Sequence, residues 1–133
     1  MIARHNVGDR VEWLGFVDAA AKPGFFQSID ALAMPSAFEC FGLVAAEALG
    51  AGVPVIVSPT VGVADMIADA DCGTIVPPRA DALAACLRSL GDGVELARWR
   101  ANARPAALRL FSFGAHGACL RDLYDAMISA RQS

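Results

Sequence analysis

Two glutamates, Glu39 and Glu47, are the side chains of this 133-residue chain whose spacing points to binding chemistry. Gly42 lies between them at the expected start of a helix, where the first backbone N–H groups have no helical partner and the dipole favours an anion. A residue without a side chain lets a phosphate approach those N–H groups. Glu47 follows roughly 7–8 Å further along the helix, at ~1.5 Å per residue, which is about the step from a diphosphate to the ribose of one nucleotide.

The two carboxylates suit sugar hydroxyls. A carboxylate close to a diphosphate is repelled unless hydrogen-bond donors lie between the two, and a sugar diol supplies two donors to one carboxylate. The spacing therefore predicts that Glu47 holds ribose hydroxyls. Glu39 lies in the loop before the helix, so we expect it to accept hydrogen bonds from a second sugar attached to the diphosphate.

These residues need a strand–loop–helix–strand unit to position them, and residues 35–58 have that pattern. In open α/β sheets, ligands bind at the carboxyl ends of the strands, which places the loop from Ser36 to Phe41 at a candidate site. Periodicity and turn residues predict strands over 11–17, 31–36 and 54–58 and from 73, and helices over 23–28, 41–52, 64–68 and 80–90. Such alternation with short connections predicts an α/β fold with a doubly wound, parallel, Rossmann-like sheet.

The two ends of the chain differ from this alternation. Residues 94–133 form a mostly helical segment, with breaks expected near Pro105 and over 112–117. Residues 1–10 are a polar stub where such a sheet would already have laid down one or two strands. We therefore expect residues 1–133 to form one partial domain that is truncated at its N-terminus.

Composition excludes several classes of function. The net charge is −3, the pI is near 5.2, and Lys22 is the only lysine. A nucleic-acid partner is excluded, because proteins that bind a phosphate backbone need clustered basic residues. The four cysteines are far apart, with neither zinc-ligand nor redox spacing. The most apolar stretch, 49–57, is interrupted by glycine and proline and is short of the ~20 residues of a membrane span. With no secretion signal, the cytoplasm is the expected compartment.

The segment from Pro35 to Ser58, PSAFECFGLVAAEALGAGVPVIVS, resembles the signature of family-four retaining glycosyltransferases with the GT-B fold. The resemblance extends to the LGFV stretch, the Gly62 loop, the GTIVPP strand and the late Phe-Ser-Phe that leads to Tyr124. It implies that the chain is the C-terminal, donor-binding half of such an enzyme. The partners implied are a nucleoside diphosphate sugar and a missing N-terminal acceptor domain, and a peripheral membrane acceptor stays open.

Carried over by position, the resemblance implies a role for each residue of the motif. Glu39 would face the donor sugar as the catalytic residue, and Glu47 would hold the ribose. The amides of Phe41, Gly42 and Leu43 would contact the sugar and the distal phosphate. Phe16 and Val17 would border the base. Gly62, in the loop after the strand expected over 54–58, is the last donor-binding position.

The resemblance also implies retention at the anomeric carbon and neither a metal nor another cofactor. Asp69-Ala-Asp71 has the form of an Asp-x-Asp metal motif, but it falls in a turn before a strand, where Asp bonds to the local backbone. Three features depart from the family: Cys40 replaces a common Gly, Val61-Gly62 replaces Gly-Gly, and Asp65 replaces Glu. The family's diphosphate-binding Arg and Lys belong to an upstream loop outside this chain.

Two other functions compete with this prediction. The chain could be a non-catalytic module or subunit that binds a nucleotide or nucleotide sugar. A dinucleotide-binding or epimerase domain is disfavoured because no G-x-G-x-x-G follows a strand. Without the basic residues and the acceptor domain, we expect the isolated chain to bind nucleotide weakly and to transfer no sugar.

Overall fold

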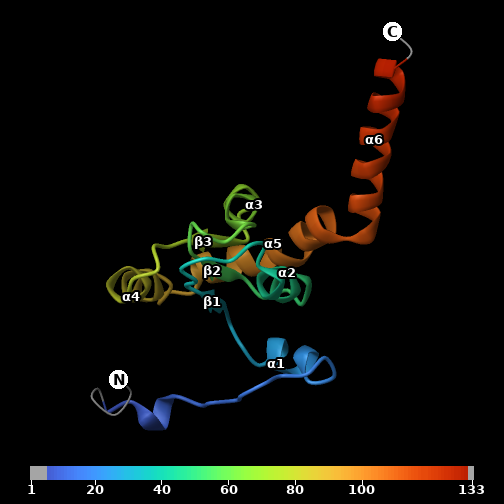
Figure 1. Cartoon of the computed structure of the whole chain (residues 1–133). Helices are drawn as coiled ribbons and strands as arrows, with labels where there is room; N and C mark the ends of the chain where they lie inside the picture. The colour runs from blue at the N-terminus through green and yellow to red at the C-terminus, as the bar shows by residue number, and fades with distance from the viewer. Residues whose placement is uncertain (1–5, 132–133) are drawn as a thin grey trace.

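The centre of the molecule is a parallel sheet in a computed structural model that describes residues 6–131 (Figure 1). The described strands lie in the order β1-β2-β3 and are β1 (Leu32–Met34), β2 (Val55–Val57) and β3 (Gly73–Ile75). Leu32 pairs with Val55, and Val55 pairs with Gly73, so the first residues of the three strands lie side by side. The predicted α/β class with a parallel sheet is confirmed.

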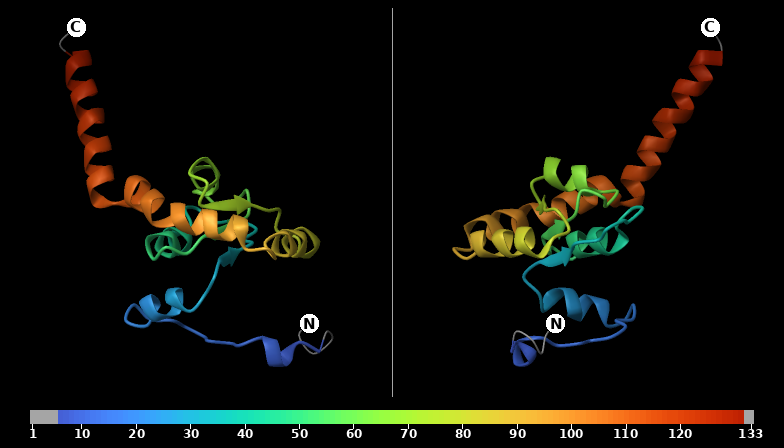
Figure 2. Two further views of the ribbon diagram at one scale, coloured as in Figure 1. Left: turned by 180° about the vertical axis from the view of Figure 1, so that it is seen from behind. Right: turned by 60° about the vertical axis from the view of Figure 1, so that its left-hand side comes forward.

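Helices follow the strands as the sequence predicts. A short 3-10 helix, Gly8–Arg10, precedes them. The α-helices are α1 (Lys22–Gln27), α2 (Leu43–Gly50), α3 (Ala64–Asp69), α4 (Ala80–Ser89), α5 (Val94–Phe111) and α6 (Phe113–Arg131). α2 packs against α5 and against the first two strands, whereas α6 projects away from the rest of the molecule in every view (Figures 1 and 2). No helix within residues 6–131 combines the length and the apolar character needed to cross a membrane.

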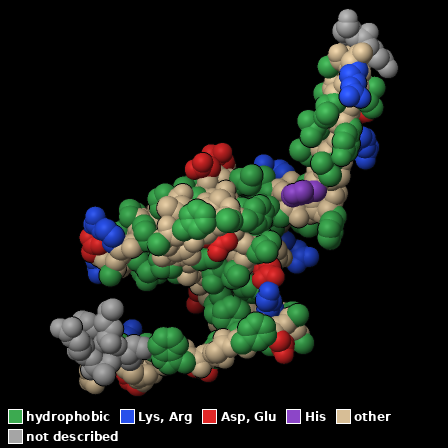
Figure 3. Space-filling view, viewed as in Figure 1, with side chains coloured by type: hydrophobic (Ala, Val, Ile, Leu, Met, Phe, Trp, Pro, Cys, Tyr) green, Lys and Arg blue, Asp and Glu red, His purple; other side chains and the backbone are tan. Residues whose placement is uncertain are grey.

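The strand predicted over 11–17 is wrong. This segment has no strand assignment, and its apolar side chains lie at the surface, with Trp13 84% and Phe16 93% exposed (Figure 3). A strand needs a neighbouring backbone to accept and donate its ladder hydrogen bonds. The described sheet contains only β1, β2 and β3. Residues 11–17 therefore alternate apolar and other side chains as a strand does, but no neighbouring strand in the described part of the chain pairs with them.

The break predicted near Pro105 is also wrong, because α5 continues through Pro105. Proline removes one helical hydrogen bond, yet the flanking Ala103, Ala106 and Ala107 are buried in the core and hold the helix against its neighbours. The chain breaks instead at Ser112, which has extended backbone angles (φ −72°, ψ 153°) and lies at the start of the second predicted break.

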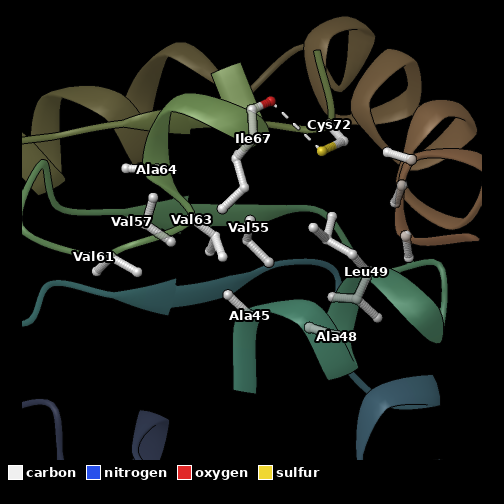
Figure 4. Close-up of a cluster of buried hydrophobic side chains, with 14 of the residues drawn as sticks. Ala45, Ala48, Leu49, Val55, Val57, Val61, Val63, Ala64, Ile67 and Cys72 are labelled. Atoms are coloured by element: carbon white, nitrogen blue, oxygen red, sulfur yellow. Dashed lines mark hydrogen bonds between the residues drawn. The ribbon is translucent and has the colours of Figure 1, made fainter. Parts of the chain in front are cut away.

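The core lies on both faces of β2, whose three residues are all buried. Val55 and Val57 belong to a cluster with side chains of α2, α3 and α5 (Figure 4). Ile56 points to the opposite face and packs with Leu90 and Trp99. Alternate side chains of a strand point to opposite faces, so the continuous apolar run of β2 is explained by helices that cover both sides.

Candidate functional site

The loop after β1 is fixed to the end of β2 by two hydroxyl groups. Thr60 Oγ1 donates to the Ser36 carbonyl at 2.8 Å, and Ser58 Oγ donates to the same oxygen. Ser58 is fully buried and lies 3.2 Å from Thr60 Oγ1. The carboxyl ends of two neighbouring strands are thus tied together where the sequence places the site.

The same loop then runs beside residues 60–62. The Glu39 N–H donates to the Thr60 carbonyl at 3.3 Å, and the Gly62 N–H donates to the Glu39 carbonyl at 3.1 Å. A Cβ on Gly62 would lie 2.1 Å from the Cys40 carbonyl oxygen, which is closer than any side chain allows. Gly62 is therefore needed for the close approach of two loops, and its contribution to the site is to hold the Glu39 backbone in place.

The Glu39 side chain bonds to the backbone that leads into α2. Its Oε1 accepts hydrogen bonds from the Gly42 N–H at 3.2 Å and from the Phe41 N–H at 3.4 Å. Gly42 has φ 98° and is the N-cap residue, a left-handed backbone that favours glycine. Two of the three amides predicted to meet a sugar and a phosphate thus already bind a carboxylate oxygen. The third predicted position, Leu43, is the first residue of α2 and its side chain is 68% exposed.

Glu47 lies in the middle of α2 and is engaged by a cation. Lys22 Nζ donates to both carboxylate oxygens of Glu47, each at 2.7 Å. Both side chains are partly exposed, 37% for Lys22 and 40% for Glu47. The contact joins the start of α1 to α2.

A shallow cavity of about 360 Å³ opens beside Glu47. It is lined by residues of the α2 region and of the junction between α5 and α6: Phe41, Leu43, Ala46, Glu47, Phe111 and His116. The rings of Phe41 and Phe111 meet edge to face, with centroids 6.0 Å apart. Apolar walls with one carboxylate at the rim are what a sugar or a base would contact.

The predicted residues are only partly brought together. Phe41, Leu43 and Glu47 share the cavity, and Glu39 lies at the amino end of the same helix. Phe16 and Val17 line a different cavity of about 370 Å³, beside α1. Their predicted contact with a base stays a prediction, as do the ligand contacts of the other residues.

Sequence reasoning overlooked three residues at the site. Lys22 stands out in the sequence only as the single lysine, and no local signal indicates that His116, which is exposed, lines the cavity beside α2. Phe111 belongs to the Phe-Ser-Phe motif, but its contact with Phe41 spans 70 positions and has no local signal. Within residues 6–131, no three side chains of His, Cys, Asp or Glu are grouped as metal ligands.

Comparisons with known proteins agree on one family. Residues 1–105 match the family model described as glycosyl transferases group 1. The D-inositol 3-phosphate glycosyltransferase of Streptomyces coelicolor is 30% identical over 131 residues, which are 98% of this chain and 29% of that protein. Glycogen synthase of Mycobacterium tuberculosis is 35% identical over 101 residues, which are 75% of this chain and 24% of that protein.

Solved structures show the same similarity. The sucrose-phosphate synthase of Thermosynechococcus elongatus superposes with a TM-score of 0.80 and 30% identity, over 97% of this chain and 33% of that one. Anabaena HepE in complex with UDP and glucose superposes with a TM-score of 0.78 and 26% identity, over 93% of this chain and 34% of that one. The chain thus spans about a third or less of each of these four proteins.

Proposed function

The chain belongs to the group 1 glycosyltransferases, and on that premise we propose that it is the donor-binding part of an enzyme that transfers a sugar from a nucleoside diphosphate sugar to an acceptor hydroxyl. The sugar is transferred with retention at the anomeric carbon and without a bound metal or other cofactor. The similarity to HepE, which was solved with UDP and glucose, supports a nucleotide-sugar donor.

The observation that carries this proposal is the pair of glutamates at α2, with Glu39 just before the helix and Glu47 within it. The Phe41 and Gly42 amides donate to a carboxylate oxygen of Glu39 just before α2, so they can donate to an anionic oxygen at that position. In the proposed complex, a phosphate oxygen of the donor takes that place, and Glu39 turns to the hydroxyls of the transferred sugar. Once Glu39 has turned, the fold holds these backbone amides in place, and fixed donors aimed at a leaving diphosphate are a large source of catalysis in such a site.

The remaining donor contacts follow along α2. Glu47 binds the ribose hydroxyls at the rim of the cavity that Phe41 and Leu43 also line. Phe16 and Val17 border the base, and Gly62 keeps the Glu39 loop against residues 60–62.

The acceptor is bound elsewhere in this proposal. An N-terminal domain, outside these 133 residues, carries the acceptor and the basic groups that neutralise the diphosphate. A peripheral membrane acceptor is compatible with this arrangement, and the proposed compartment is the cytoplasm. By itself the chain binds nucleotide weakly and transfers no sugar.

A binding experiment tests the donor site directly. We would titrate the 133-residue chain with UDP, GDP, ADP and the corresponding nucleotide sugars, followed by NMR chemical shifts so that millimolar affinities can be measured. We expect one nucleotide to bind and Glu47→Ala to weaken it about tenfold, a loss of ~1.4 kcal/mol. Glu95→Ala is the matched control, because Glu95 is also a half-exposed helical glutamate paired with a basic residue.

Three results of these measurements would contradict the proposed donor site or favour the alternative function. The absence of binding by any nucleotide, or equal binding by the Glu47→Ala variant, would contradict the proposed donor site. Binding without transfer when the chain is joined to an upstream acceptor domain would favour the alternative, a non-catalytic nucleotide-sugar module.

A further inference from the structure

One cation faces the predicted ribose site, and neither the motif nor the proposed function accounts for it. Lys22 begins α1, and its ammonium group contacts both carboxylate oxygens of Glu47. We propose that Lys22 is a positioning residue of the donor site: it orients the Glu47 carboxylate and offsets its charge, so that Glu47 can bind the ribose beside the diphosphate. This inference rests on the proposed function.

The geometry of the contact fits this role. The two oxygens of Glu47 lie at the same distance, 2.7 Å, from Lys22 Nζ, which fixes the orientation of the carboxylate. An ionised carboxylate has about four acceptor positions, and Lys22 occupies one on each oxygen. The other position on each oxygen is left for a sugar diol, so the ribose can bind while the ion pair persists.

The charges near α2 give the second reason. Glu39 and Glu47 both lie on this helix or just before it, and the proposed ligand carries a diphosphate. Like charges a few ångströms apart repel one another, so a bare carboxylate at position 47 would weaken nucleotide binding. Lys22 neutralises that carboxylate. Other basic side chains with described ion pairs are directed to other acids: Arg79 to Asp81, Arg98 to Asp71 and Glu95, and Arg100 to Asp30.

A purely structural role for this ion pair is the competing explanation. Exposed ion pairs contribute little to stability, and Lys22 and Glu47 are both more than a third exposed. α1 is attached to the core by Phe26, which is 5% exposed and packs in the main cluster. Substitutions at Lys22 should therefore leave the fold intact, so their effect on binding can be interpreted.

The test is a double-mutant cycle with a nucleoside control. We would measure the affinity of the chain for UDP and uridine, or for GDP and guanosine if that pair binds better, with Lys22→Met, Lys22→Arg, Glu47→Gln and the Met/Gln double variant. The matched control is Arg100→Met, which breaks the ion pair to Asp30 in another part of the molecule. Thermal unfolding of each variant reports on the fold.

We expect Lys22→Met to weaken the nucleotide about tenfold, which is the size of a typical coupling between contacting residues. The nucleoside should also bind more weakly, but by a smaller factor, because it carries no diphosphate for an unpaired Glu47 to repel. Lys22→Arg should restore binding to within about threefold, because arginine also bonds both oxygens of a carboxylate. The double variant should bind no more weakly than Glu47→Gln, and Arg100→Met should bind like the unaltered chain.

Several results would overturn the inference. Unchanged nucleotide affinity in Lys22→Met, or additive losses in the double variant, would show that Lys22 does not act through Glu47. A loss for the nucleotide without a loss for the nucleoside would show that Lys22 contacts the phosphates directly. If the unaltered chain bound no nucleotide at all, the proposed function would itself have failed, and the inference would fall with it.

Discussion

The centre of the molecule and its two ends carry the same kinds of apolar side chain, but the ends bury none of theirs, whereas the centre contains most of the buried core. We call residues 32–111 the centre, and residues 11–21 and α6 the arms. In the centre, Val55 is 0% and Ile56 is 2% exposed, whereas Phe16 in the first arm is 93% exposed. Figure 3 shows hydrophobic side chains at the surface along both arms.

The second arm makes the difference clearest. The exposed apolar residues of α6 recur every three or four positions, which places them on one face of the helix: Leu120, Leu123, Tyr124, Met127 and Ile128. The same periodicity in α2 produces the buried Ala45, Ala48 and Leu49. An apolar pattern thus marks a face suited to burial, but contact with another element decides whether the face is buried.

The largest expected effect compares two leucines. Leu49→Ala should destabilise the chain by about 3 kcal/mol, because it leaves a cavity at a site that is 0% exposed. Leu123→Ala in α6 should change stability by less than about 0.5 kcal/mol, since Leu123 is 54% exposed. Urea unfolding measures both. Equal losses would mean that α6 is packed in solution, and the contrast between centre and arm would be withdrawn.

Two glycines give the next effect. Gly62→Ala should cost about 2 kcal/mol, the usual size for overpacking, because its Cβ would strike the Cys40 carbonyl. Gly24→Ala in α1 meets nothing within 4 Å and should stabilise the chain by about 0.5 kcal/mol through helix propensity. Thermal unfolding checks the opposite signs. A neutral Gly62→Ala would show that the Glu39 loop is not held as described.

A smaller effect is expected at Glu39. Glu39→Ala removes the carboxylate that accepts from the Phe41 and Gly42 amides, so stability should fall by about 1 kcal/mol, the usual net contribution of such hydrogen bonds. Glu12→Ala in the first arm is the control and should have no measurable effect. If the two variants unfolded alike, the Glu39 hydrogen bonds would contribute nothing to the fold.

The smallest effect at neutral pH concerns the buried thiol in the centre. Burial raises the pKa of Cys72 to about 11, so the folded state keeps a proton that the unfolded thiol loses near its usual pKa of about 8.5. Stability should therefore be unaffected below pH 8 and fall as the pH rises toward 11. Cys72→Ala should reduce that fall.

The cysteines of the two regions can also be compared by labelling. At pH 8, a thiol reagent should modify the exposed Cys40 and Cys119 quickly and Cys72 only on unfolding. Mass spectrometry of the digested chain identifies the modified residues. Rapid labelling of Cys72 in the folded chain would show that the centre opens more readily than its packing indicates.

Much of the centre followed from the sequence. The order of elements from β1 to α4 was predicted because each has a local signal: the apolar run of 54–58, the glycines that end α2 and the leucine spacing of α4. The loop from Ser36 to Phe41 was predicted to lie at the ends of the strands, and it does. The error over 11–17 arose because alternation predicts the conformation of one strand and says nothing of its neighbour.

At the site, the sequence determined which groups are present: two acids, a glycine at a helix start and a single lysine. Only the tertiary structure decided how they are partnered. Glu39 turns back onto the amides of Phe41 and Gly42 just before α2, and Lys22 reaches Glu47 across 25 positions. The physical reason is range: helix and strand signals depend on residues a few positions apart, whereas ion pairs, strand ladders and burial depend on which distant segments meet when the chain packs.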